Sequence, residues 1–195
     1  AGVEWILELS RAAQDPPTFL ASVVNAPWLP AAQREPVFRR LLETAEARAA
    51  QAIGEAREFE RNEARNWRER WIAYLVESGQ TARAGSEIAA LPAEWRRAMG
   101  ESLILHEVRI AVSNGRLASL LEQWKAHPER ALSIDGMRDE AVTLREKRDS
   151  RNAALLLDYA CSEELAARPR GAAAFLCLGE ARLDLNDPAG AAAIL

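Results

Sequence analysis

Short polar turns recur at a nearly constant interval through much of this sequence, and their spacing constrains the fold more than any other feature. Gly79, Asn114, Arg148 and Asn186 each lie in such a turn, and the intervals between them are 35, 34 and 38 residues. Near-fixed intervals of this length are typical of stacked helical hairpins, in which each hairpin buries its apolar face against its neighbours. The sequence therefore predicts a stacked array of hairpins.

The residues around the four turns follow the same interval. A small residue lies five positions after each turn residue, where it would let the two helices of a hairpin approach closely, and these residues are Ala84, Ser119, Ala153 and Ala191. Leu75, Ile110 and Leu144 lie four positions before the first three turn residues. Nine positions after the turn residues lie Ile88, Gln123, Leu157 and Leu195, so that Gln123 is the one polar exception.

The pattern of apolar residues predicts an all-α fold. Apolar residues recur at spacings of three and four, strong helix formers dominate, and no useful stretch alternates with the period of a strand. Arginine greatly outnumbers lysine, which we interpret as a bacterial, GC-rich coding bias.

Composition limits the partners and the compartment. The net charge is −4, and neither half of the chain is strongly basic, so we do not expect nucleic acid as a partner. No apolar run is long enough to span a bilayer. The sequence as it stands begins without a signal peptide, and a cytoplasmic or a periplasmic location remains open. We expect Cys161 and Cys177 to be buried as small apolar groups, with neither a disulfide framework nor a thiolate metal site.

The N-terminal third has a different pattern. Residues 1–30 predict a helical hairpin around Asp15-Pro16-Pro17, with Asp15 as a cap of the second helix and with four apolar side chains facing each other, namely Trp5, Leu9, Phe19 and Val23. A link with several prolines follows at 25–36. Residues 31–64 predict a linker and a long helix, because an apolar stripe runs from Val37 to Leu75. We favour one long or kinked helix within 36–78 over two helices that meet near Gly54 or Asn62.

Two further features, the tryptophans and a charged run, each allow two interpretations. Trp67 and Trp71 share a helix face, which favours the core over an anchor at an interface, whereas Trp28 lies in a loop with prolines and is expected to be exposed. The charged run 55–70 alternates in sign and predicts a solvated helix face with short-range ion pairs rather than a docking surface.

The last unit resembles the tetratricopeptide repeat. The residues that carry the resemblance are Phe175, Leu178, Gly179, Ala181, Asn186, Asp187, Ala191 and Leu195 in the unit 172–195. The units 65–98, 100–133 and 134–167 fit more loosely, so that the resemblance covers 65–195. It implies a right-handed α-α superhelix whose concave groove binds a protein or peptide. The positions that line such a groove carry over to Asn66, Glu69, Ala73, Ile104, Val108, Arg138, Val142, Arg145, Leu176 and Glu180, with Glu77, Val112, Asp135 and Asp184 at further positions.

Motifs for catalysis or metal binding are missing from the sequence. His106-Glu107 lacks the second histidine of a zinc-binding helix, and Gly85-Ser86 lacks the glycines of a nucleophile elbow. Asp184-x-Asn186-x-Pro188 begins like a calcium loop, but proline stands at a ligand position, and we expect Asp187 to cap the following helix. We therefore predict no catalytic residue, no metal and no cofactor.

The function expected from these features is that of a non-enzymatic scaffold for protein or peptide binding. The chain ends within the second helix of the unit 172–195, which indicates a fragment of a larger protein and leaves an unfinished surface for self-association. The alternative is a solenoid arm of a larger cell-envelope enzyme or of a transcription regulator.

Overall fold

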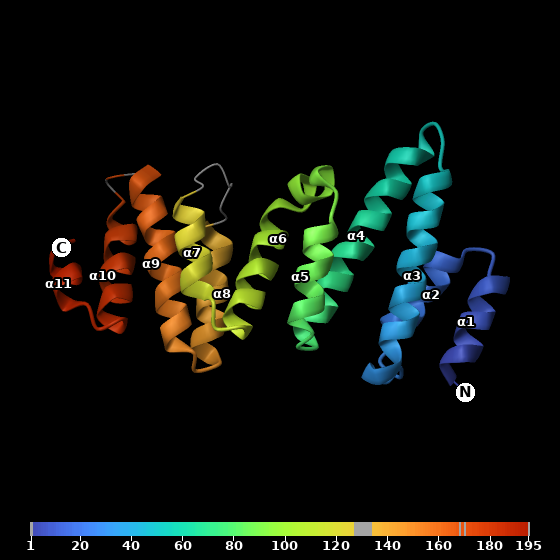
Figure 1. Cartoon of the computed structure of the whole chain (residues 1–195), viewed down its shortest axis with the longest axis horizontal. Helices are drawn as coiled ribbons and strands as arrows, with labels where there is room; N and C mark the ends of the chain where they lie inside the picture. Colours follow the sequence, from blue (N-terminus) through green and yellow to red (C-terminus); the bar gives the residue numbers. More distant parts are fainter. Residues whose placement is uncertain (1, 127–133, 168, 170, 195) are drawn as a thin grey trace. The chain divides into compact units, whose positions relative to one another are not determined.

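The computed structural model describes residues 2–126, 134–167, 169 and 171–194, and over these residues the protein is all α (Figure 1). Helices account for 83% of the described residues, which include no strand. The eleven helices described are α1 (Gly2–Ala12), α2 (Pro16–Val24), α3 (Ala31–Gln51), α4 (Ala56–Glu77), α5 (Thr81–Ala90), α6 (Ala93–Ser113), α7 (Leu117–Lys125), α8 (Ile134–Glu146), α9 (Ser150–Ala167), α10 (Ala172–Asp184) and α11 (Pro188–Ala192). The all-α prediction is confirmed.

The chain forms two compact units, which are described separately. The first unit is Ala1–Tyr74 and the second is Leu75–Leu195, so that their boundary falls within α4. The limits predicted at residues 30 and 64 do not coincide with this boundary.

The first unit begins with the hairpin of α1 and α2, but α1 turns a different face inward from the one expected. α1 packs against both α2 and α3. Ile6 and Ser10 are its buried residues, whereas Trp5 is 62% exposed and Leu9 is also exposed. The buried Ser10 hydroxyl donates a hydrogen bond to the Leu7 carbonyl at 2.7 Å, which satisfies its polar group. The expected pairing of Trp5 and Leu9 with α2 is therefore wrong.

Asp15 precedes α2 as expected, but its side chain does not cap the helix backbone. The carboxylate accepts hydrogen bonds from the Thr18 hydroxyl at 2.8 Å and from Arg48 of α3 at 3.0 Å instead. Arg48 also pairs with the buried Glu60 of α4 at 2.8 Å. A single guanidinium therefore connects α3 both to the start of α2 and to α4.

The single long helix that we favoured is two helices in the structure. α3 ends at Gln51, Ala52 is extended, and Gly54 has a φ of +60°, in the left-handed region that glycine enters without a steric penalty. The break falls at the first of the two positions considered for a junction. Ile53, which we placed on the apolar stripe, is 85% exposed at this break. The predicted link 25–36 is also too long, because α3 begins at Ala31 and contains Pro36.

Aromatic rings join α3 to α4 within the first unit. The ring of Phe38 lies 6.1 Å from that of Trp67, 5.5 Å from that of Trp71 and 5.8 Å from that of Tyr74, measured between centroids. Trp67 and Trp71 are buried, so the core interpretation of this pair is confirmed, and Trp28 is 65% exposed as expected. The charged run 55–70 differs from our expectation, because Glu60 and Arg68 pair with Arg48 and Glu46 of α3 rather than only within their own helix.

The second unit repeats one turn geometry four times. The residues with positive φ at these turns are Gly79, Gly115, Arg148 and Asn186. In each turn the N–H of the following residue donates to the carbonyl five positions earlier, and the pairs are Gln80–Leu75, Arg116–Ala111, Asp149–Leu144 and Asp187–Arg182, at 2.8 or 2.9 Å. This is the Schellman arrangement, which satisfies carbonyls at the end of the first helix.

The second turn lies one residue later than predicted. Gly115 rather than Asn114 adopts the left-handed conformation, since a glycine meets no Cβ clash there. The position nine residues after the turn therefore belongs to the buried Trp124 and not to the exposed Gln123. The expected small residue Ser119 is exposed for the same reason. With this correction the position nine residues after the second turn is apolar, as it is at the other three turns.

The helices of the second unit pack mainly on their neighbours along the chain. α6 packs on α5, α7 and α8, while α9 packs on α7, α8 and α10, and α10 packs on α11 (Figure 1). A buried cluster links α6 to α9, and within it the rings of Trp124 and Tyr159 lie 6.1 Å apart. Asp187 caps α11 as predicted, since its carboxylate accepts the Gly190 N–H at 2.9 Å.

Candidate functional site

The structure separates the ten predicted groove residues into three groups. Asn66, Glu69 and Ala73 lie on α4 in the first unit, and Asn66 is exposed. Ile104 and Val108 are 9% and 0% exposed. They belong to the buried cluster of the second unit, so these two residues are not available to a ligand, and their assignment to a binding surface is wrong.

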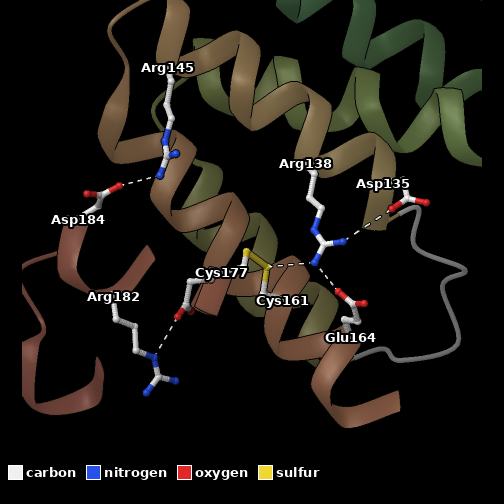
Figure 2. The surroundings of a disulfide bond; sticks show 9 residues. Asp135, Arg138, Arg145, Cys161, Glu164, Cys177, Arg182 and Asp184 are labelled. Carbon is white, nitrogen blue, oxygen red and sulfur yellow. Dashed lines mark hydrogen bonds and ion pairs between the residues drawn. A yellow bond between two sulfur atoms is a disulfide. The ribbon is translucent and has the colours of Figure 1, made fainter. Parts of the chain in front are cut away.

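The remaining five predicted residues come together on two helices. Arg138, Val142 and Arg145 lie on α8, and Leu176 and Glu180 lie on α10. Arg145 donates a hydrogen bond to the Asp184 carboxylate at 2.8 Å, which ties the end of α8 to the end of α10 (Figure 2). Spacings of three, four and seven residues put the members of each helix on one face.

We call this region the α8–α10 surface and define it by Asp135, Arg138, Val142, Arg145, Leu176, Glu180, Leu183 and Asp184. Three large apolar side chains are exposed in it, with exposed fractions of 57% for Val142, 60% for Leu176 and 54% for Leu183. Leu183 was missed in the sequence, although it lies seven residues after Leu176 and therefore on the same face of the helix. Charged side chains of both signs flank these apolar residues.

A disulfide fixes the helices behind this surface. Cys161 of α9 and Cys177 of α10 are bonded, with their Cα atoms 6.3 Å apart (Figure 2). The expectation of two separate buried thiols is wrong. The two positions face each other only because α9 and α10 pack together, and sequence separation alone does not show that proximity.

Ion pairs hold the same helices together. Arg138 of α8 pairs with Glu164 of α9, and its guanidinium lies 3.8 Å from the Cys161 sulfur (Figure 2). Arg182 of α10 pairs with Asp158 of α9 at 3.2 Å. The surface is therefore carried by three helices with several cross-links.

Comparison with protein-family models, with curated proteins and with solved structures found no match to this chain. Among the described residues, no helix has the length and apolar character that crossing a membrane requires. Within the same part of the chain, no group of three or more His, Cys, Asp or Glu side chains is placed to hold a metal ion.

Proposed function

We propose that this protein is a non-enzymatic helical-repeat scaffold of the tetratricopeptide type that binds a segment of another protein at the α8–α10 surface. The observation that carries the proposal is the exposure of Val142, Leu176 and Leu183 on two helices tied by the Arg145–Asp184 pair. Burial of a Leu or Val side chain contributes about 1.5–3 kcal/mol. Three such residues would supply most of the affinity of a short peptide.

The rigidity of the surface supports the same proposal. Binding is weakened by every side chain and helix that must become ordered on association. The disulfide and the ion pairs of Arg138 and Arg182 already fix α8, α9 and α10. The four equal turns support a repeat architecture, and the right-handed superhelix is part of the proposal.

The chemistry of the surface indicates the kind of segment that it accepts. Apolar residues alternate with charges of both signs, including Arg138, Arg145, Glu180 and Asp184. A complementary segment is amphipathic, with apolar side chains at its centre and both acidic and basic residues beside them. Such a segment gains affinity from the apolar residues and specificity from the charges.

The test is a selection of peptides from an unbiased displayed library on the immobilised protein, followed by affinity measurements on the peptides selected. Leu176→Gln should weaken binding by about tenfold or more, since it removes an apolar contact of the order of 1.4 kcal/mol. Ile53→Gln is the control, because Ile53 is an exposed apolar residue of the first unit, at 85% exposed against 60% for Leu176. Equal affinities for the two variants would contradict the proposal, and so would a selection that yields no binder.

The disulfide favours one of the alternatives as a second candidate function. Disulfides persist in oxidising compartments such as the bacterial periplasm and are rare in the cytosol. We therefore propose that, if the protein is not an independent scaffold, it serves as the arm of a cell-envelope enzyme rather than of a transcription regulator. Mass spectrometry of the alkylated protein from its native cells tests this. Free thiols at Cys161 and Cys177 would argue against a periplasmic location.

A further inference from the structure

A cleft lies away from the α8–α10 surface, between the earlier helices of the second unit. α5, α6 and α7 enclose an open-sided cleft of about 410 Å³. Cavities that bind small molecules usually have volumes of about 300–1,000 Å³. Its lining residues are Gly85, Ile88, Ala89, Arg96, Glu107, Ile110, Ala111, Arg116, Ser119, Leu120 and Gln123.

Much of the cleft lining is apolar. Ile88 of α5, Ile110 of α6 and Leu120 of α7 each contribute one wall, and Ala111 lies with Ile110 on α6. These residues are buried or half-buried, so the cleft presents apolar surface below the level of the surrounding side chains. An apolar molecule placed here would gain about 25 cal/mol for each Å² that it removes from water.

Small residues leave the cleft open. Gly85 and Ala89 on α5 face Ser119 on α7 across it. A Cβ atom added at Gly85 would meet nothing within 4 Å, and its φ is not in the left-handed region. A Cβ atom at Gly85 would therefore enter open space, and a longer side chain at this position would extend from there.

Two arginines give the cleft an excess of positive charge. Arg96 donates to the carbonyls of Leu91, at 3.2 Å, and of Ala89, which fixes its guanidinium at the edge of the cleft. No described carboxylate pairs with Arg96 or with the exposed Arg116, and Glu107 is the one acidic residue in the lining.

Arg116 differs in its pairing from the arginines that link α6, α8, α9 and α10. Arg109 pairs with Glu140 at 2.7 Å, and Arg138, Arg145 and Arg182 each pair with a carboxylate as well. Those arginines serve the packing of helices, whereas Arg116 has a charge that no described protein group neutralises. An anionic group of a ligand is the complement that it lacks.

We propose that this cleft binds a small amphipathic anion, a molecule with an apolar body and one carboxylate. The apolar body lies against Ile88, Ile110 and Leu120, and the carboxylate pairs with Arg116. Gln123 of α7 also lines the cleft, and its side-chain amide offers a further hydrogen-bond donor. This site is separate from the α8–α10 surface and does not depend on the function proposed for it.

The test uses three probes and isothermal titration calorimetry on the intact protein. Octanoate carries both the apolar body and the carboxylate, octanol carries only the apolar body, and acetate carries only the carboxylate. We expect octanoate to bind and the other two to bind about tenfold more weakly or not at all, because octanol lacks the carboxylate and acetate lacks the apolar body. No binding of octanoate, or equal binding of octanol, would overturn the proposal.

Two variants assign the binding to the cleft. Gly85→Leu fills the space from α5, and Arg116→Gln removes the charge but keeps a polar side chain, so each should weaken octanoate binding by about tenfold. Arg151→Gln is the control, since Arg151 is an exposed arginine of α9 outside the cleft. An unchanged octanoate affinity in Gly85→Leu, with unfolding equal to that of wild type, would place the ligand elsewhere and refute the site.

Discussion

The two units of this protein are both helical, but they are stabilised in different ways. The first unit concentrates its packing in a few large groups, with Phe38 in contact with the rings of Trp67, Trp71 and Tyr74. The second unit buries one cluster that runs from α6 to α9 and repeats one turn geometry at Gly79, Gly115, Arg148 and Asn186. The comparison indicates that a regular repeat needs no single dominant residue, because each hairpin is supported by its neighbours.

The ion pairs and the disulfide are also arranged differently in the two units. In the first unit one guanidinium, that of Arg48, pairs with both Asp15 and Glu60 and so connects three segments at one point. In the second unit the ion pairs of Arg109 and Arg182 each join two helices, α6 to α8 and α10 to α9, and a disulfide joins α9 to α10. We therefore expect single substitutions to be most damaging in the first unit.

The largest effect is expected from Trp71→Ala in the first unit. Trp71 is 2% exposed and lies in the aromatic cluster, so its truncation should lower the free energy of unfolding by about 3–5 kcal/mol. Urea unfolding followed by far-ultraviolet circular dichroism measures this change. Trp28→Ala is the matched control and should change stability by less than about 0.5 kcal/mol, because Trp28 is 65% exposed. Similar losses for the two variants would show that the aromatic cluster is not what stabilises the first unit.

An intermediate effect is expected from reducing the disulfide of the second unit. The bond joins cysteines sixteen residues apart in sequence, and opening a loop of this size should lower the free energy of unfolding by about 3 kcal/mol at most. Urea unfolding with and without dithiothreitol gives the difference. The double variant Cys161→Ala/Cys177→Ala should not respond to the reductant. Coincident curves for the oxidised and reduced wild type would show that packing alone holds α10 on α9.

The smallest effect tests whether the four turns are equivalent. Arg148 occupies the left-handed position that glycine occupies at two of the other turns, so Arg148→Gly should raise the free energy of unfolding by about 0.5–1 kcal/mol. Arg151→Gly, at the second residue of α9, should instead lower it by up to a similar amount, since glycine is a poorer helix former than arginine. Thermal unfolding of both variants compares them directly. If Arg148→Gly were less stable than wild type, the four turns would share a backbone conformation but differ in the residue that each prefers at the left-handed position.

The features that depend on local sequence could be predicted well. The helices and the four turns follow from apolar spacing and from residues such as Gly79 and Asn186, whose influence extends only over a few neighbours. The error at Asn114 is also local, because an Asn-Gly pair offers two candidates for one left-handed position, and glycine meets the lower steric cost. A break at Gly54 was not favoured from the sequence, because a lone glycine is compatible with a helix and indicates a helix end only weakly.

The features that depend on packing could not be predicted. Cys161 and Cys177 become partners only when α9 lies against α10. Ile104 and Val108 occupy positions that the resemblance assigns to a groove, yet they are covered because they join a core cluster with Met137 and Ala141 of α8. The rotation of a helix about its own axis decides which of its faces is covered, and a repeat pattern constrains that rotation only loosely.

The uniform turn within each hairpin also indicates where this chain tolerates changes in length. A Schellman turn fixes the number of residues between its two hydrogen-bonded groups, so an added residue would separate Asp149 from Leu144 and disturb both helices. The number of residues between the end of one hairpin and the start of the next already varies, being two between α5 and α6, eight between α7 and α8 and four between α9 and α10. Insertions and deletions in evolution should therefore accumulate at these connections, and the same positions are suited to an inserted tag or label.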